Sequence, residues 1–267
     1  MRLTISHTTR YKYDAPVRYG LSRLRLKAGT DACQTVISWK TEIVGGKKEV
    51  AYFDHFHNAV ELVSLDPDAQ EILVRSEGVV DTCDRAGVAG EHLGFAPLWL
   101  YRRNTPLTTP GPQVADLVKA LEPVGGDTLA RLHALTGLIA ERVVYRSGQT
   151  TSASTAEDAL TAGHGVCQDH AHVFLSAVRA LGLSGRYVSG YLMMDDRVEQ
   201  DASHAWAEAY VKGLGWVGFD VSNAICPDDR YVRVATGLDY DDAAPISGMR
   251  LGAASESMVV AVQVSEQ

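Results

Sequence analysis

Hydrophobic and polar residues alternate, in part, with a period of two through the first 82 residues of the chain. The alternating segments are short, and the turn signals DAP, GTD, GG and DPD separate them. Short alternating segments bounded by glycine, proline and aspartate are typical of antiparallel strands. We therefore expect strands over residues 2–13, 23–28, 34–44, 51–65 and 69–82.

A stretch rich in proline and large apolar residues, 84–113, follows these strands. We expect it to be an ordered passage rather than a flexible linker, because its apolar side chains would otherwise be exposed. Residues 1–105 are together expected to form an N-terminal antiparallel β module.

A helical period replaces the alternation after Pro112. The pattern predicts helices over 114–122 and from Asp127, an expected N-cap, into the 140s, and a short helix within 157–163. A longer helix begins at Cys167. Strands are then expected over residues 185–194, 203–213, 215–223, 230–240 and 256–264. This order predicts an α+β core over 106–225, and a C-terminal loop and strand, 226–267, that packs back on the β portion.

Composition narrows the range of functions. Apolar residues make up 46% and charged residues 22% of the chain, close to an ordinary globular protein. The formal net charge of −8 argues against a surface that tracks phosphates, so we expect no nucleic-acid partner. No apolar stretch approaches the ~20 residues that span a bilayer, and the N-terminus lacks the apolar region of a signal peptide. We expect no membrane partner and a cytoplasmic location.

The four cysteines, Cys33, Cys83, Cys167 and Cys226, form no CxxC pair. Their spacings resemble neither a zinc ribbon nor a disulfide framework. In a reducing compartment most should be free thiols. We expect three of them to be small, partly buried residues without chemistry, and Cys167 to be the exception.

Cys167 lies in the first turn of its expected helix, just after Gly163 and Gly165. The free N–H groups and the positive end of the helix dipole favour a thiolate there. The same N–H groups are placed to hold a developing oxyanion. The position favours a nucleophile over an inert thiol, which would more naturally lie in the middle of the apolar face.

A thiolate nucleophile needs a base and a group that orients the base. His204 begins a strand in which bulky residues alternate with alanines, and the next strand ends in Asp220. If the two strands pair through a turn near residue 213 or 214, residue 204 lies opposite about 222–224. Asp220 is then within reach of the imidazole and could fix its tautomer.

A zinc site is the competing reading of the same stretch. His164, Cys167 and His170 are spaced by two residues. This set lacks a paired cysteine elsewhere and leaves His204 and Asp220 unexplained. His170 and His172 also point about 200° apart on a helix, so both cannot face Cys167. We therefore expect neither a metal nor a cofactor.

At these motifs the sequence resembles a known family. GHGVCQDHAHVFLSAVRALGLSGRYVSGYL and SHAWAEAYVKGLGWVGFDVSN look like the transglutaminase-like superfamily, in its bacterial branch of cysteine proteases, over roughly residues 115–225. ISHTTRYKYDAPVR resembles the β module that precedes this core in that branch, and the tail from VRVATGLDY to SESMVVAVQV resembles its closing segment.

The resemblance implies a papain/transglutaminase-like fold, with a catalytic helix packed on an antiparallel sheet. It maps the nucleophile to Cys167 in GVCQD, the general base and acid to His204 in HAWAE, and the orienting acid to Asp220 in GWVGFD. Many relatives continue with Pro-Thr after that aspartate, whereas this chain reads DVSN, a departure that concerns the local turn and not the acid.

Four neighbours are candidates for the cleft. Gln168 and Gly165 flank the nucleophile, and His164 lies three residues before it; a loop histidine in solvent is the alternative reading of His164. Trp206 is expected in the core or the cleft wall, and it could instead shape an acyl-binding tunnel. Asp169, in the first helical turn, is expected to complement the dipole or accept backbone N–H groups.

These observations predict a cysteine-dependent acyl-transfer enzyme acting on peptide or glutamine-type side-chain amides through a thioester. Family analogy favours a hydrolase, that is, a peptidase or amidase. A protein-glutamine transglutaminase with an amine acceptor and a non-catalytic binding module that keeps the fold are the alternatives. The expected partner is a peptide or protein amide, with a homodimer through the β module as a further possibility.

Overall fold

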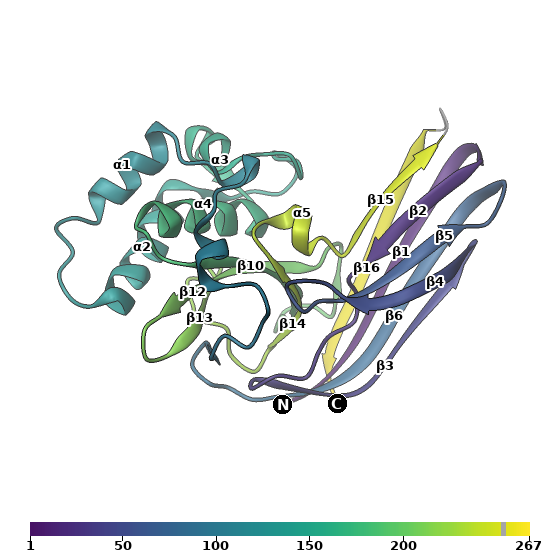
Figure 1. Ribbon diagram of the computed structural model, residues 1–267, viewed down its shortest axis with the longest axis horizontal. Helices are drawn as coiled ribbons and strands as arrows, with labels where there is room; N and C mark the ends of the chain where they lie inside the picture. Colours follow the sequence, from purple (N-terminus) through teal and green to yellow (C-terminus); the bar gives the residue numbers. More distant parts are fainter. Residues whose placement is uncertain (252–254) are drawn as a thin grey trace.

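The computed structural model of the protein describes residues 1–251 and 255–267. It contains a lobe of helices packed on a sheet and, beside it, a module of long strands (Figure 1). The two ends of the chain lie together at the base of the module, where the Gln267 N–H donates to the Arg2 carbonyl at 3.0 Å. The α+β class expected from the sequence is confirmed.

Two antiparallel sheets form the β module. The first has the strand order β11 (Glu199–Gln200), β16 (Glu256–Glu266), β1 (Arg2–Val17), β6 (Ala69–Thr82) and β3 (Gln34–Val44). The second has the order β15 (Ile246–Leu251), β2 (Tyr19–Leu24), β5 (Ala59–Leu65) and β4 (Gly46–Phe53). Strand β1 buries every second residue over its first half, including Leu3 and Ile5, which explains its alternating sequence.

The segment 51–65, expected as one strand, is instead a hairpin of β4 and β5. The Asp54 carboxylate accepts the backbone N–H groups of Phe56 and Asn58 at 3.0 and 2.9 Å and so stabilises the turn between them. Asp54 and Asn58 are residues that favour turns, but they lie within a segment of partial alternation, which predicts one continuous strand. Strand β15 was likewise not expected, because its segment reads as a loop.

The helical lobe is built on a third antiparallel sheet. Its strand order is β14 (Tyr231–Gly237), β10 (Gly185–Leu192), β12 (His204–Val211), β13 (Gly215–Phe219) and β7 (Val88–Gly90). A short parallel pair joins β8 (Val144–Tyr145) to β9 (His164–Gly165). The helices are α1 (Pro112–Ala120), α2 (Thr128–Arg142), α3 (Ala156–Ala162), α4 (Cys167–Ala180) and α5 (Tyr240–Ala243), with 3₁₀ turns at Leu98–Arg102 and Pro106–Thr108.

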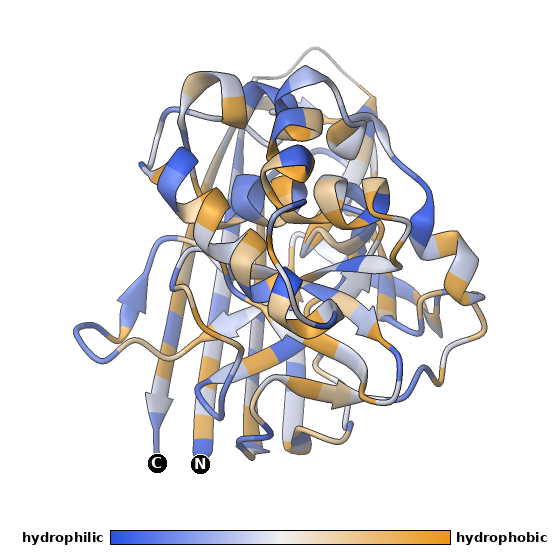
Figure 2. Cartoon of the chain, turned by 90° about the vertical axis from the view of Figure 1, so that its left-hand side faces the viewer, coloured by the Kyte–Doolittle hydropathy of each residue, from blue (hydrophilic) through white to orange (hydrophobic). Residues whose placement is uncertain are grey.

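Helix α4 lies at the centre of the lobe. Its apolar residues share one buried cluster with Ala205, Ala207 and Ala209 of β12, and with residues of α1, α2 and α3. The small alanines let the helix approach the sheet closely, which is why the bulky residues of β12 alternate with alanine. Figure 2 shows hydrophobic and hydrophilic residues side by side on the helices of this lobe. Asp127 caps α2 as expected, accepting the Ala130 N–H at 2.9 Å.

The lobe and the module share strands from distant parts of the sequence. Strand β14 pairs with β10 in the lobe, whereas β16 pairs with β1 along Leu3–Tyr13 in the module. The segment after residue 225 therefore joins both sheets. No helix among residues 1–251 and 255–267 is long and apolar enough to cross a membrane.

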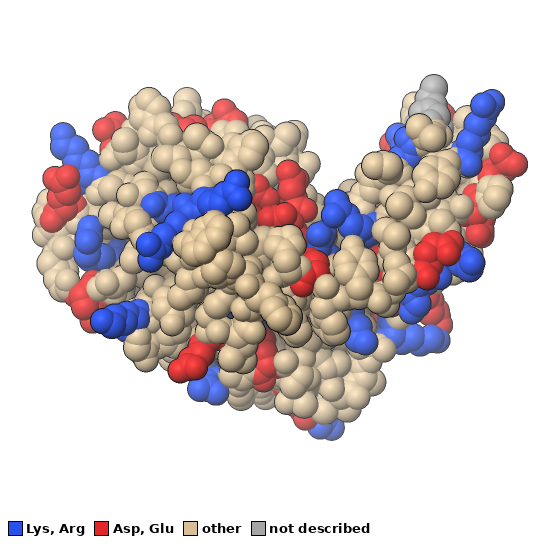
Figure 3. Space-filling view, viewed as in Figure 1, with Lys and Arg blue, Asp and Glu red and all other residues tan. Residues whose placement is uncertain are grey.

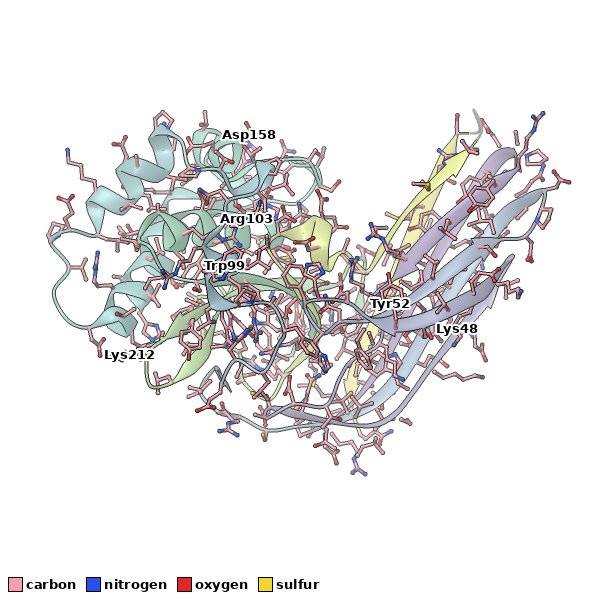
Figure 4. The ribbon with its side chains drawn as sticks, in the orientation of Figure 1. Lys48, Tyr52, Trp99, Arg103, Asp158 and Lys212 are labelled. Atoms are coloured by element: carbon pink, nitrogen blue, oxygen red, sulfur yellow. The ribbon has the colours of Figure 1, made fainter. Side chains whose placement is uncertain are left out.

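A hollow separates the two parts at one end of the molecule (Figure 3). A cavity of about 340 Å³ lies there, lined by Tyr11 and Tyr13 of β1 and by Ser152 and Asp241 of the lobe. Figure 4 shows Trp99 and Arg103 on the lobe, and Tyr52 and Lys48 on strand β4 of the module.

A buried ion-pair network joins three strands of the sheet in the helical lobe, β12, β10 and β14. Glu208 is 1% exposed and accepts the Arg186 Nε–H at 2.6 Å, and it also pairs with Arg233. Arg186 in turn lies over the Trp216 ring, 4.3 Å from its centre. Glu208 therefore supplies the negative charge that two arginines share in the interior.

Replacing Glu208 with glutamine is expected to destabilise the fold strongly. The variant keeps the volume but takes the paired carboxylate from Arg186 and leaves Arg233 with Asp31 alone. Removing one partner of a buried ion pair typically costs about 3–5 kcal/mol. The free energy of unfolding from urea titration measures the effect. Glu42→Gln, at an exposed pair with Lys40, is the matched control and should change little. Equal effects of the two variants would contradict this reading of the network.

Candidate active site

Cys167 is the first residue of α4, as the sequence predicted. Its side chain is partly exposed. The Asp169 carboxylate reaches back to accept the Val166 N–H at 2.7 Å and the Thr150 hydroxyl at 2.7 Å, which fixes the first turn. The next N–H groups, including that of Cys167, have no acceptor within the helix. They are free to bind a negatively charged oxygen beside the thiol.

Gly165 permits this arrangement. A Cβ atom at this position would lie 2.6 Å from the Asp169 Cβ, so any larger residue would displace the carboxylate. Gly165 is buried in β9. The turn before Cys167 therefore requires a glycine at this position.

His204 and Asp220 meet as the strand pairing predicted. In the β12–β13 register Ala207 lies opposite Phe219, so residue 204 lies opposite 222. His204 Nε2 and Asp220 Oδ2 are 2.6 Å apart, and the two residues are 7% and 1% exposed. Asp220 engages Nε2, which leaves Nδ1 for the hydrogen bond between His204 and the Cys167 thiol. The structure therefore brings Cys167, His204 and Asp220 together in that order.

The charge states of His204 and Asp220 depend on each other. Burial opposes a charged imidazolium, but the hydrogen bonds to Asp220 and Cys167 outweigh it and raise the pKa of His204 to about 10. Burial likewise opposes a charged carboxylate, but hydrogen bonds, the one with His204 first, hold the pKa of Asp220 below its ordinary value. The raised pKa of His204 favours an imidazolium, which places a positive charge beside the Cys167 sulfur.

These two shifts set the pH range in which the ion pair stabilises the fold. The raised pKa of His204 gives a contribution that is complete below 6.5, its ordinary value, and is lost as pH rises toward about 10. The lowered pKa of Asp220 gives a contribution present above 3.8, its ordinary value, and lost as pH falls below it. The pair therefore contributes most between these two ordinary values.

Two further donors reach Asp220, and sequence reasoning missed both. The Tyr231 hydroxyl of β14 donates to Asp220 Oδ2 at 2.7 Å, and the Asn223 side-chain amide donates to the same oxygen at 2.7 Å. Asn223 belongs to the DVSN turn that departs from the Pro-Thr of many relatives, so this turn holds the acid by another route. The only signal for Tyr231 was its place in a strand.

Tyr231→Phe should shift the pH dependence of Cys167 alkylation. The variant removes one donor from Asp220, so the carboxylate attracts the imidazolium more strongly and the pKa of His204 rises further. The upper inflection in the rate of Cys167 alkylation by iodoacetamide should move to higher pH by roughly one unit or less.

The matched control is Tyr191→Phe, another buried tyrosine, whose hydroxyl bonds His7 at 3.0 Å instead. That variant should leave the alkylation profile in place. A Tyr231→Phe profile that coincides with the wild-type profile, together with a lower unfolding midpoint, would reduce Tyr231 to a packing residue.

The other three expected cleft residues, apart from Gly165, have different surroundings. The buried Trp206 ring stacks beside His204, with centres 6.3 Å apart, and so forms a wall of the site. The Gln168 side chain points to the neighbouring loop, where its amide donates to the Ser152 carbonyl at 3.2 Å. His164 is half-buried in β9 rather than free in solvent. None of these contacts assigns a substrate role to Gln168 or His164.

The two histidines of α4, His170 and His172, have structural roles. His170 bonds the Ser222 hydroxyl and the Val143 carbonyl, both at 2.8 Å, so neither ring nitrogen is available to a zinc ion with Cys167. His172 is fully buried, and burial lowers its pKa to about 4. Within the part of the chain that the structure describes, no three His, Cys, Asp or Glu side chains are grouped to hold a metal ion.

A cysteine at the start of a helix, facing a histidine and an aspartate on an antiparallel sheet, defines the class of papain/transglutaminase-like cysteine enzymes. Residues 116–221 match the family described as the transglutaminase-like superfamily, and residues 3–81 match the bacterial transglutaminase-like N-terminal region. The chain therefore belongs to the transglutaminase-like superfamily, in its bacterial form with this N-terminal region.

Known proteins resemble the whole chain. An uncharacterized protein of Mycobacterium leprae is 28% identical over 289 residues, covering 99% of this chain and 98% of its own. An uncharacterized protein of Mycobacterium tuberculosis is 27% identical and covers 98% and 91%. The crystal structure of a "Putative Cysteine Protease" from Cytophaga hutchinsonii superposes with a TM-score of 0.77 at 22% identity, covering 100% of this chain and 91% of that one. That superposition supports the fold.

Proposed function

We propose that the protein is a cysteine-dependent acyl-transfer enzyme that opens peptide or glutamine-type side-chain amides through a thioester on Cys167. One observation carries the proposal. His204 hydrogen-bonds both the Cys167 thiol and the buried Asp220 carboxylate. Cys167 itself lies at the start of a helix whose first N–H groups are free. Each requirement of nucleophilic catalysis at an amide thus has a residue in place.

The first half of the reaction forms the thioester. His204 takes the thiol proton, and the Cys167 sulfur attacks the amide carbonyl carbon. The carbonyl oxygen gains negative charge and is held by the N–H groups at the start of α4. His204 then gives its proton to the nitrogen as the C–N bond breaks, and the amine leaves. Asp220 keeps the imidazolium oriented throughout.

The second half resolves the thioester. Water gives a proton to His204 and attacks the thioester carbonyl, and the Cys167 thiolate leaves and is reprotonated. The product is then a carboxylic acid. A primary amine in place of water gives a new amide, which is the transglutaminase outcome. We favour water as the acceptor, on the analogy with the bacterial cysteine proteases of this family.

Mass spectrometry of reaction products tests this proposal. A library of peptides and γ-glutamyl amides is incubated with the enzyme, with and without an added primary amine. The proposal expects free acid as the main product in both conditions, and none with Cys167→Ala. Products that carry the added amine would assign transferase activity instead. No turnover of any amide, with Cys167 unreactive, would mark the chain as a binding module.

A further inference from the structure

Two cysteines outside the candidate active site face each other across a strand pair. Gln34 lies opposite Thr82 where β3 begins and β6 ends, so Cys33 and Cys83 form the next pair outward. The Cys83 N–H donates to the Cys33 carbonyl at 2.9 Å, which shows that the pairing continues to these residues. The Cys33 N–H donates instead to the Asp31 carboxylate at 2.7 Å. Cα atoms of residues directly opposite each other in an antiparallel pair lie about 4.5–5.5 Å apart, inside the range that a disulfide spans.

The two thiols share one hollow but differ in exposure. Both cysteines line a depression that Trp206 and Tyr231 also line. Cys83 is exposed and Cys33 is half-buried. Both are free thiols. Each sulfur lies 3.5 Å from a backbone carbonyl oxygen, that of Ala32 for Cys83 and that of Val88 for Cys33.

The residues next to these cysteines hold the strand that carries Tyr231. The Gln34 side chain donates to the Arg233 carbonyl and accepts the Arg233 N–H, both at 2.8 Å. The Thr82 hydroxyl donates to the Asp229 carbonyl on the other side of Tyr231. A covalent link between positions 33 and 83 would therefore tie these two supports of β14 together.

We propose that Cys33 and Cys83 form a redox-sensitive dithiol that a low-molecular-weight disulfide such as glutathione disulfide converts to an intramolecular bridge. The Cys83 thiolate attacks one sulfur of glutathione disulfide and releases one glutathione thiol. The Cys33 thiolate then attacks the Cys83 sulfur of the mixed disulfide and releases the second. Two protein thiols are oxidised and one small disulfide is reduced to two thiols.

The environments of the two sulfurs fit this order. Cys83 is exposed and meets the oxidant first. Burial, together with the nearby charge of Asp31, raises the pKa of Cys33 to about 11, so Cys33 is slow toward a dissolved oxidant. Its attack on Cys83 is intramolecular, and proximity offsets the small thiolate fraction.

The test uses the full chain with Cys167→Ser, so that the candidate nucleophile does not compete. Reduced protein is treated with glutathione disulfide, remaining thiols are blocked with N-ethylmaleimide, and a digest without reductant is read by mass spectrometry. We expect one peptide pair joined through Cys33 and Cys83, with a mass two hydrogens below the sum, and Cys226 blocked. The unfolding temperature of the oxidised protein should exceed that of the reduced protein.

Two further variants sharpen the test. Cys33→Ser in the same background should leave one glutathione on Cys83 and show no gain in unfolding temperature, and Cys226→Ser should still form the bridge. Glutathione retained on Cys83 with Cys33 blocked, when both cysteines are present, would overturn the proposal. Failure of both thiols to react would overturn it as well. Neither result bears on acyl transfer at Cys167.

Discussion

Replacing Cys167 with alanine is expected to abolish amide turnover while the protein stays folded. Removing the nucleophile of a triad lowers kcat by roughly a million-fold, because the remaining groups cannot form the covalent intermediate. The side chain is partly exposed and its helix is held by other contacts, so the fold should tolerate the change. Product formation from the amide library measures the first effect, and the unfolding midpoint measures the second.

Cys226→Ala is the matched control for this variant. Cys226 is also a partly exposed free thiol, and burial raises its pKa. Its loss should leave turnover unchanged. If Cys167→Ala turned over an amide as fast as the wild type, the assignment of the nucleophile would be wrong.

Asp220→Asn should be the second most damaging change. The variant removes the buried charge that helps hold the His204 pKa at about 10, so this pKa falls. The amide can also donate to Nε2 and so favour the wrong tautomer. We expect kcat/KM to fall by roughly 10²–10⁴-fold, and the Cys167 alkylation profile to lose its high-pH inflection near 10.

Asp228→Asn provides the control, since Asp228 lies on the same loop and pairs with Arg230 rather than with His204. That variant should keep kcat/KM within a few-fold of the wild type. Comparable losses in the two variants would show that any lost charge on this loop disturbs the site, and that Asp220 has no special role.

Local patterns predicted that Cys167 begins its helix and that Asp220 lies within reach of His204, whereas the expectation that Cys167 meets His204 came from the family resemblance. The start of α4 follows from two glycines and a helical period, and the β12–β13 register follows from a short turn. A short hairpin leaves little freedom in register, so Asp220 could be placed relative to His204 within a few residues.

Local sequence patterns could not predict contacts between distant segments. Tyr231 reaches Asp220 only because β14 pairs with β10, and nothing in the local sequence of either strand specifies that pairing. Cys33 and Cys83 were expected to have no chemistry, and only the β3–β6 register sets them opposite each other. Partner choice between strands depends on the packing of the whole sheet, which periodicity does not encode.

Selective alkylation tests the central claim most directly, because it requires no substrate. Wild type and His204→Ala are treated with limiting iodoacetamide at about pH 6, where an ordinary thiol reacts slowly, and labelling of all four cysteines is quantified by mass spectrometry. A thiolate paired with His204 predicts that Cys167 is labelled far ahead of Cys33, Cys83 and Cys226 in the wild type, and that this preference disappears in His204→Ala. Labelling of Cys167 no faster than of exposed Cys83, or a preference that survives loss of His204, would contradict the account.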